Sequence, residues 1–392
     1  MPAPTEPIVL YGMPASLYTG KARAYLRRRG LPFEERSAGD PRFRAQVLPV
    51  VGRWIIPVVQ LPGGRLVQDS TDIIDALDAG APPGESAYPA SPLLRAVSLF
   101  FELYGGEGLL RPAMHYRWNF DADNLAFLRA DFGASLAAPG ASRAERDAAF
   151  EFAAARMRKA ATAFGVTPLT APLIEAACRE FLARFDAHLE HHPFLLGGRA
   201  TIGDYGLVAA LYAHLGRDPH PASLMKSVAP HVWRWVERMN APERSTGEYA
   251  HAGPADGRLF DDDALPGTLV ELLRFAAQDY LPEIEAHVAF ANRWLREHPD
   301  LRTGTNGLAK PGERAIGRAT FAWRGGELTV VVMPYRLYLL QRVQDAIASA
   351  PAADRGRLDA LLADAGLASL ASLTTIRRVE RRDHLEVWGP PR

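Results

Sequence analysis

The sequence predicts an α/β domain, then an all-helical domain, then a small α+β extension. Apolar runs alternate with helical patterns over residues 1–82, and helical spacing dominates residues 93–248. Within residues 264–392, two β-type runs flank a Gly-Gly pair. Linkers rich in proline and glycine separate the three regions. A chain of 392 residues is long enough for two or three domains, so we expect domain boundaries at these linkers.

The composition excludes several classes of function. Lysine plus arginine and aspartate plus glutamate both number 45, so charge gives no reason to expect nucleic acid as a partner. No stretch is long and apolar enough for a membrane span, and the first residues lack the features of a signal peptide. Cys178 is the one cysteine, which rules out an intrachain disulfide. We therefore expect a cytoplasmic protein.

The expected elements of the first domain alternate between strands and helices. They are a strand at 8–12, a helix at 17–29, strands at 33–36, 55–61 and 65–67, and a helix that opens at Asp69-Ser70.

The second domain and the extension contain mostly helical patterns. Residues 118–170 are expected to be an insertion in the helical domain, and Thr201 to Asp204 form a capping box at a helix start. In the extension we expect helices at 267–280, 282–297 and 334–347, a hairpin of 318–323 with 327–333 around Gly325-Gly326, and a last strand at 384–388.

Three short motifs in the first domain are candidates for chemistry. Ser16 precedes a helix, where serine is a favoured N-cap. Ile56-Pro57 precedes a strand, and Asp69-Ser70 opens the next helix. Each motif taken alone has a purely structural explanation. Their order along the chain supports a functional interpretation.

Residues 7–82 and 170–240, with these motifs, resemble the two domains of the cytosolic glutathione transferase superfamily. The resemblance implies a thioredoxin-like first domain and an all-helical second domain, as in a bacterial-type serine member with a long C-terminal extension. It ends near residue 250. Redox relatives carry two cysteines where this chain has Ser16 and Thr19, so dithiol exchange is not expected.

The resemblance implies that glutathione is the co-substrate and that Ser16 donates a hydrogen bond to its thiolate. The positive end of the following helix would favour the same charge state. Tyr18 and Tyr11 are rival hydroxyl donors, with Tyr11 better explained as a core residue at a strand end.

The other motif residues are expected to hold the rest of glutathione. The resemblance implies that the backbone of Ile56, before a cis Pro57, pairs with its cysteinyl part. Asp69 would meet the amino group and Ser70 the carboxylate of the γ-glutamyl end. Arg53 is either a partner of the glycyl carboxylate or a solvated turn residue.

An aromatic and cationic cluster in the second domain is the candidate substrate pocket. In the resembled family this region faces the thiol site, although for any one residue helix packing is the favoured explanation. The cluster consists of Tyr104, Met114, Tyr116, Arg117 and Trp118.

These expectations describe an enzyme that transfers the glutathione thiolate to a small apolar electrophile. One alternative is a non-catalytic binding or scaffold protein that acts through the extension. Another is a glutathione-dependent isomerase, lyase or peroxidase. A homodimer is possible, as is usual in the family. No metal is expected, because His188, His191 and His192 lack a carboxylate or cysteine at ligand spacing.

Overall fold

The computed structural model describes residues 6–82, 84–242, 249, 257–310 and 312–392. Its first domain is a four-stranded sheet in the order β2-β1-β3-β4, in which β1 and β2 are parallel and the other pairs antiparallel. This confirms the thioredoxin-like α/β prediction. The elements are β1 (Ile8–Gly12), α1 (Leu17–Arg28), β2 (Phe33–Ser37), α2 (Leu48–Val51), β3 (Val58–Gln60), β4 (Leu66–Gln68) and α3 (Ser70–Asp78).

The strand predicted at 55–61 is shorter in the structure, because β3 begins only after Pro57, which has no N–H to donate to a ladder. Within the sheet, Val58 pairs with Tyr11 on one side and with Gln68 on the other. One row across the sheet therefore brings together the end of β1, the start of β3 and the end of β4.

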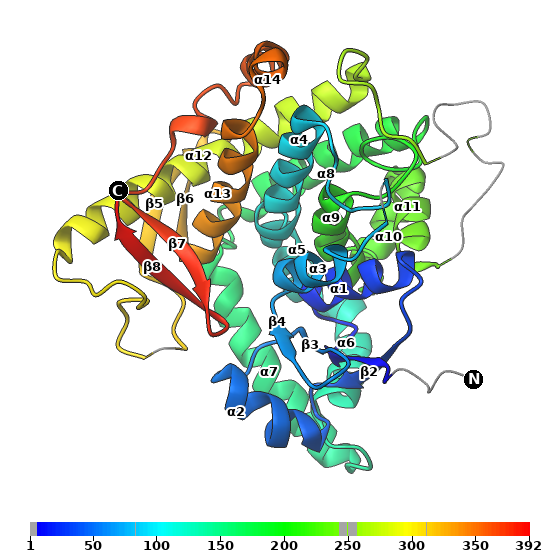
Figure 1. Cartoon of the computed structure of the whole chain (residues 1–392). Coiled ribbons are helices and arrows are strands. Elements are labelled where there is room, and N and C mark those ends of the chain that lie inside the picture. Colours follow the sequence, from blue (N-terminus) through cyan, green and yellow to red (C-terminus); the bar gives the residue numbers. More distant parts are fainter. Residues whose placement is uncertain (1–5, 83, 243–248, 250–256, 311) are drawn as a thin grey trace.

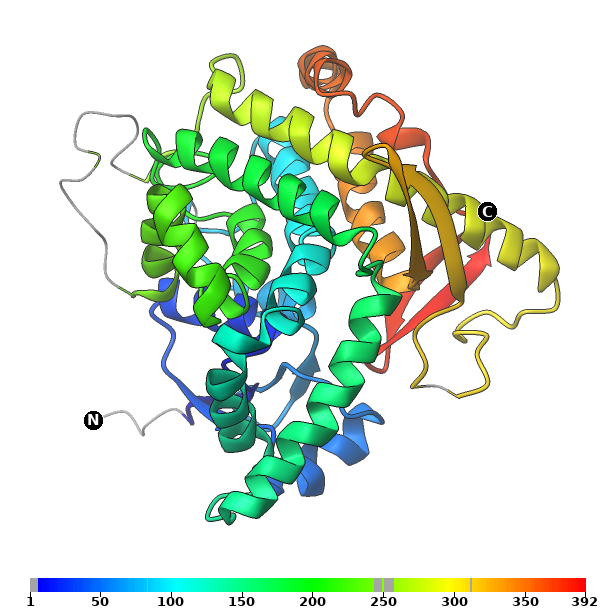
Figure 2. The ribbon, with the colours of Figure 1, turned by 180° about the vertical axis from the view of Figure 1, so that it is seen from behind.

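The second domain is all-helical, as predicted. Its capping box is present at the start of α9, with both reciprocal hydrogen bonds between Thr201 and Asp204. Helices α6 and α7 lie in the region expected to be an insertion, and α7 extends toward α2 (Figure 2). The helices are α4 (Pro92–Leu103), α5 (Leu110–Trp118), α6 (Asp121–Leu136), α7 (Arg143–Ala163), α8 (Ala171–Leu189), α9 (Ile202–Ala213), α10 (Pro219–Val228) and α11 (Pro230–Asn240).

In the described residues, the extension adds two separate hairpins and three α-helices. They lie beside the second domain (Figure 1). The turn of the β7–β8 hairpin points toward the first domain. The elements are α12 (Gly267–Glu297), β5 (Gly317–Trp323), β6 (Gly326–Val332), α13 (Pro334–Ala348), α14 (Ala352–Asp364), β7 (Arg377–Arg382) and β8 (Leu385–Pro391).

The prediction of two helices at 267–280 and 282–297 is wrong, because α12 is continuous through Pro282. A proline inside a helix costs about 3 kcal/mol through its missing N–H and its ring. Here the helix buries apolar side chains on both sides of the proline, such as Leu273 and Ile284, and packs against α8 and β5. Burial of this face offsets the local cost.

The strand prediction in the extension also needs correction. The β5–β6 turn is Arg324-Gly325, both at positive φ, and Gly326 already belongs to β6. Strand β7 and helix α14 were not predicted. Four of the six residues of β7 are arginine, so it has no apolar run, and α14 buries only Leu358 and Leu362.

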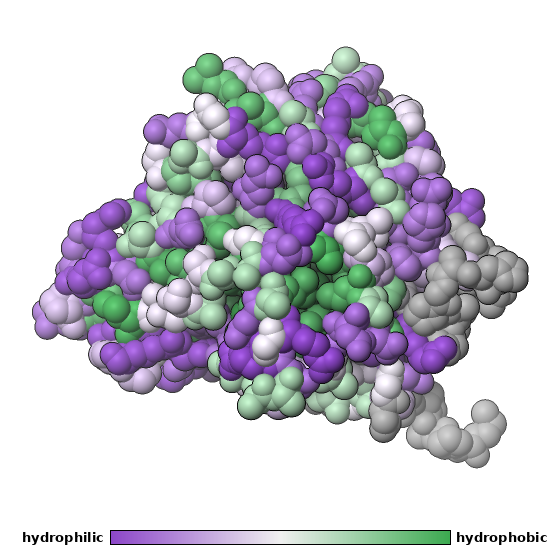
Figure 3. Space-filling model, turned by 90° about the horizontal axis from the view of Figure 1, so that it is seen from above, coloured by the Kyte–Doolittle hydropathy of each residue, from purple (hydrophilic) through white to green (hydrophobic). Residues whose placement is uncertain are grey.

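The extension shares one hydrophobic core with both other domains. This core contains Leu17 of α1, Phe101 of α4 and Leu337 of α13, all buried. Helix α13 packs along α4, and β5 lies against α12. On the upper face of the molecule, hydrophobic residues are interspersed with hydrophilic ones (Figure 3). In the described part of the chain, no helix has both the length and the apolar character needed to cross a membrane.

Candidate functional site

Ser16 lies at the amino end of α1, directly after the loop that leaves β1. Its Oγ accepts a hydrogen bond from the Thr19 backbone N–H at 3.3 Å. Gly12 allows this close approach of strand and helix, because a Cβ there would lie 2.2 Å from the Thr19 methyl group. The capping bond uses an Oγ lone pair, so the Ser16 O–H remains a donor. The capping role and the donor role are therefore compatible.

The two tyrosines are placed differently from Ser16. Tyr11 is buried against Phe43, with ring centroids 6.0 Å apart, in a small cluster behind the sheet. The Tyr18 hydroxyl donates to Glu107 Oε1 at 2.9 Å. Burial, with the Glu107 carboxylate beside it, raises the pKa of Tyr18 well above its usual range. Tyr18 therefore stays neutral, and its one proton is already shared with Glu107.

The second and third motifs meet beside the end of β1. The Ile56–Pro57 peptide bond is cis, as the resemblance implies. The Asp69 N–H donates to the Pro57 carbonyl at 3.4 Å, which joins the two motifs directly. Tyr11, Val58 and Gln68 are in register across the sheet. The Ile56-Pro57 and Asp69-Ser70 motifs therefore lie at the same edge of the sheet as the loop that carries Ser16.

Asp69 and Ser70 have unusual local properties. Asp69 has φ 88° and ψ 136°, a backbone conformation rarely adopted by residues other than glycine. Its carboxylate caps α3 by accepting from the Thr71 N–H at 2.9 Å. Ser70 is fully buried, and its Oγ has no hydrogen-bond partner among the described residues. A buried hydroxyl without a partner at a helix amino end fits a ligand carboxylate.

Arg53 reaches across to the extension. Its guanidinium contacts Glu386 Oε2 of β8 at 3.2 Å and donates to the His384 carbonyl at 2.9 Å. Arg314 and Arg381, both in the extension, contact the same carboxylate at 3.3 and 2.5 Å. Three arginines therefore converge on one carboxylate that is 6% exposed.

The extension also contacts the Asp69 motif. Tyr335 of α13 donates its hydroxyl to Asp69 Oδ1 at 2.8 Å. Arg381 contacts Asp72 Oδ2 at 2.9 Å and Gln68 Oε1 at 2.9 Å. The edge of the first domain that carries the motifs is therefore covered by α13 and the β7–β8 hairpin.

A second buried ion-pair network lies behind Tyr18. Arg336 of α13 contacts Glu107 at 2.9 Å and Glu283 of α12 at 2.5 Å. Arg111 also pairs with Glu283. The network links α5, α12, α13 and the segment after α4, all in the interior.

The five candidate pocket residues are all buried. The Tyr116 hydroxyl and the Trp118 indole N–H have no hydrogen-bond partner among the described residues, whereas Tyr104 and Arg117 have partners. Arg117 pairs with Asp218 through two hydrogen bonds, of 2.6 and 2.9 Å. It also donates to the Ala15 carbonyl at 2.7 Å, next to Ser16. Tyr116 stacks on Phe120. Arg117 is thus placed to hold the Ser16 loop rather than to face a substrate.

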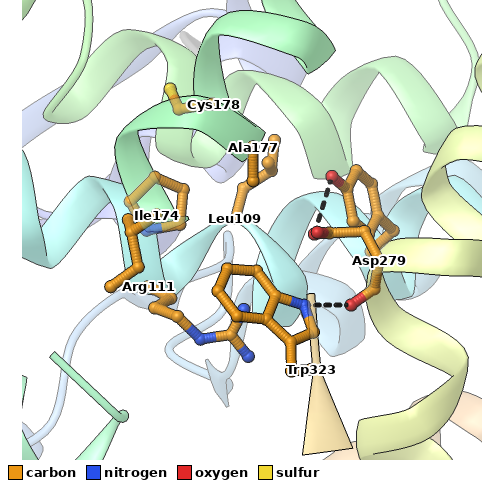
Figure 4. Close-up of a pocket in the computed structure, with 9 residues that line it drawn as sticks. Leu109, Arg111, Ile174, Ala177, Cys178, Asp279 and Trp323 are labelled. Carbon is orange, nitrogen blue, oxygen red and sulfur yellow. Dashed lines mark hydrogen bonds between the residues drawn. The ribbon is translucent and has the colours of Figure 1, made fainter. Parts of the chain in front are cut away.

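Tyr104 lines a small interior cavity of about 10 Å³, which has room for one water molecule (Figure 4). Its hydroxyl donates to Asp279, and the Trp323 indole N–H donates to the Asp279 carbonyl at 2.9 Å. Cys178 lies at the cavity wall, and burial raises the pKa of its thiol to about 12. This cysteine is therefore protonated and unreactive in the folded chain.

No group of three or more His, Cys, Asp or Glu side chains in the described residues could hold a metal ion. In the histidine cluster, His188 uses both ring nitrogens, one with Thr268 and one with the Leu195 carbonyl. Burial lowers its pKa to about 3.

The residues that sequence reasoning missed beside Arg53 and Asp69 belong to the extension. Tyr335 and Arg336 lie in a distinctive stretch, but nothing in the sequence indicates that they contact the first domain. Arg314, Arg381 and Glu386 have no local signal, since Arg53 and Glu386 are 333 positions apart.

Comparison with protein families decides the assignment of the first two domains. Residues 10–85 match the glutathione S-transferase N-terminal domain, and residues 142–238 match the glutathione S-transferase C-terminal domain. Over these domains the chain belongs to the glutathione transferase superfamily. The two matches end before the extension. No curated protein matches the chain.

Several solved structures are similar to this transferase-family chain. Glutathione transferase GSTFuA3 from Phanerochaete chrysosporium has 20% identity and a TM-score of 0.44, covering 62% of this chain and 100% of that one. Beta-etherase LigF from Sphingobium sp. strain SYK-6 has 20% identity and a TM-score of 0.41, covering 60% and 96%. A glutathione S-transferase from Methylobacterium radiotolerans, in complex with glutathione sulfonate, has 19% identity and a TM-score of 0.35, covering 65% and 99%. Because these scores are below 0.5, the assignment rests on the domain matches.

The carboxylate shared by the three arginines should make the stability of this transferase-family protein sensitive to acid. Burial alone would raise the pKa of Glu386, but Arg314, Arg53 and Arg381 together lower it from 4.5 to about 2. A carboxyl with a lowered pKa in the folded state stabilises the fold above its unfolded pKa, and this contribution is lost as the pH falls through the folded value. Since each pKa unit is worth ~1.4 kcal/mol, the contribution is roughly 3 kcal/mol.

Denaturant unfolding of the wild type and Glu386→Gln, measured from pH 6 to pH 2, checks this prediction. The wild type is expected to be more stable at pH 6, and the difference should shrink as the pH falls from 4.5 toward 2. Burial and Asp69 raise the pKa of Asp72 to about 6, so Asp72 titrates above the pH range in which the Glu386 difference should shrink. A difference that does not change with pH would contradict the prediction.

Proposed function

We propose that this protein binds glutathione at the edge of its first domain and transfers the glutathione thiolate to a small apolar electrophile. The observation that carries the proposal is the sheet row of Tyr11, Val58 and Gln68. Each residue of this row is followed or preceded, at the same edge of the sheet, by one of the motifs: β1 leads into the Ser16 loop, Ile56-Pro57 precedes β3, and Asp69-Ser70 follows β4. This is the set of groups that a thiol peptide needs.

Glutathione would supply a sulfur nucleophile, and the chain's own residues would bind and orient it. The Ser16 O–H would donate to the sulfur, with the amino end of α1 favouring its negative charge. The Ile56 backbone would pair with the cysteinyl part, and Arg53 would meet the glycyl carboxylate. Asp69 would meet the amino group and Ser70 the carboxylate of the γ-glutamyl end. Catalysis would come from positioning and charge stabilisation rather than from a covalent enzyme intermediate.

A calorimetric titration with reduced glutathione tests the binding step. Saturable binding is expected in the wild type, and Ser70→Ala should weaken it at least about tenfold, the equivalent of ~1.4 kcal/mol. Ser369→Ala, outside the site, serves as the matched control and should bind like the wild type. If none of the three proteins releases heat at millimolar glutathione, and a second binding assay agrees, the proposal is wrong.

A non-catalytic protein that keeps the fold is the second candidate. It is favoured by one observation: Arg53 and Asp69 are already engaged by Glu386 and Tyr335 of the extension. Glutathione binding with no turnover on any electrophile would support this candidate. A glutathione-dependent isomerase, lyase or peroxidase would use the same thiolate, and the products of an electrophile, isomer and peroxide screen separate these reactions from transfer.

We also propose a homodimer whose interface is a surface that the extension does not cover. Helix α13 covers α4, and Arg342 of α13 pairs with Asp75 of α3 at 2.6 Å. Light scattering coupled to size-exclusion chromatography measures the oligomeric state.

A further inference from the structure

The β7–β8 hairpin places a carboxylate at the proposed glutathione site. Glu386 is held by Arg53 of the first domain, Arg314 of the loop before β5, and Arg381 of β7. Within the described part of the chain, Glu386 is the carboxylate within ion-pair distance of both Arg53 and Arg314. Without Glu386, these two arginines would have no carboxylate within ion-pair distance among the described residues. A site built in this way requires a carboxylate, either from the chain or from a ligand.

We infer that Arg53, Arg314 and Arg381 form one carboxylate-binding site shared by the first domain and the extension, and that Glu386 occupies it until the carboxylate of a bound thiol peptide replaces it. This inference rests on the proposed function and adds two arginines of the extension to its ligand site. Arginine matches carboxylate geometry well, so the exchange of one carboxylate for another preserves the ion pairs.

The site adjoins the γ-glutamyl motif. Arg381 contacts Gln68, directly before Asp69, and Asp72, two residues after Ser70, and Tyr335 contacts Asp69 itself. A ligand that reaches both Ser70 and Arg53 must carry two separated carboxylates. Glutathione has this chemistry, with one carboxylate at each end.

The hairpin turn shows how Glu386 could leave. Its two turn residues, Asp383 and His384, have φ of 48° and 65°, a conformation that favours glycine or asparagine. Contacts to Arg53 from the His384 carbonyl and from Glu386 offset the cost of this turn. A ligand that takes over Arg53 removes both contacts together, so the end of the hairpin should become less protected.

Calorimetry with two probes tests the competition. The probes are glutathione and its glycyl ethyl ester, which lacks the glycyl carboxylate. Glu386→Gln should bind glutathione at least tenfold more tightly than the wild type. Its affinity for the ester should be close to that of the wild type. The matched control is Glu380→Gln on β7, where Glu380 pairs only with the exposed Arg382 at 3.5 Å among the described residues. This control should bind like the wild type.

Three outcomes would overturn the inference. The first is that Glu386→Gln binds glutathione no more tightly than the wild type. The second is that its affinity for the ester rises as much as its affinity for glutathione. The third is that Glu380→Gln shows the same rise in affinity for glutathione. If the wild type binds glutathione but Glu386→Gln does not bind it more tightly, the inference fails while the proposed function stands. If no variant binds glutathione, both fail.

Hydrogen exchange on the native protein keeps the test independent of any variant's folding. Saturating glutathione should accelerate exchange of the backbone amides at residues 382–386. Unchanged or slower exchange there, under conditions where glutathione binds, would show that Glu386 stays in place.

Discussion

Replacing Arg336 with methionine is expected to lower the free energy of unfolding by about 3–5 kcal/mol, the usual cost of removing one partner of a buried ion pair. Arg336 is 4% exposed, and its partners Glu107 and Glu283 are 1% and 2% exposed. Methionine keeps most of the side-chain volume, so the loss comes from the charge. Among the described residues, Glu283 would retain Arg111, whereas Glu107 would retain only the Tyr18 hydroxyl.

Denaturant unfolding measures the effect. The matched control is Arg378→Met, because Arg378 pairs with Asp345 at 2.5 Å but both side chains are about half exposed. That variant should lose less than about 1 kcal/mol, as exposed ion pairs do. Adding Glu107→Gln to Arg336→Met should recover part of the loss, since it removes the unpaired charge. A loss no larger than that of the control would contradict a central role for this network.

Replacing Ser16 with alanine is expected to lower turnover about 10- to 100-fold while glutathione still binds. The loss follows from the thiol equilibrium. If Ser16 lowers the pKa of the bound thiol by one or two units, its removal costs ~1.4–3 kcal/mol of thiolate stabilisation. The backbone of Ile56, Asp69 and Ser70 would still hold the rest of the ligand. The ultraviolet absorbance of the bound thiolate, followed against pH, should shift to higher pH in this variant.

Two variants separate this role from helix capping. Ser16→Thr keeps both the cap and a hydroxyl donor, so it should retain most of the turnover. Thr19→Val removes a neighbouring buried hydroxyl, one that has no partner in the described chain, and should leave turnover unchanged. Full turnover in Ser16→Ala would exclude the donor role. A fall in turnover without a shift of the thiolate titration would assign Ser16 to capping alone.

The motifs of the first domain could be predicted because each depends on neighbouring residues. A serine before a helix, an Ile-Pro before a strand and an Asp-Ser helix start each have a signature within a few residues. Their meeting at one edge follows from strand pairing, which alternating apolar patterns indicate only in part. The structure adds the row through Val58 that aligns them.

Other elements could not be predicted, because tertiary packing outweighed the local signal. Helix α12 continues through Pro282, where a local rule ends it. Strand β7 contains mainly arginine, and those side chains are balanced by carboxylates elsewhere in the fold, such as Asp72 and Asp345. When the carboxylate partner of an arginine lies far away in the sequence, the sequence alone does not distinguish that arginine from a solvated one.

The sequence by itself determined the order of the domains, the family of the first two and the motif residues Ser16, Pro57, Asp69 and Ser70. Only the tertiary structure decided that the extension covers this edge, with Glu386 on Arg53 and Tyr335 on Asp69. The physical reason is the range of the interactions. Caps, turns and amphipathic periods act over a few residues and leave a pattern in the sequence. An ion pair between residues 333 positions apart forms only when the whole core has brought both charges together.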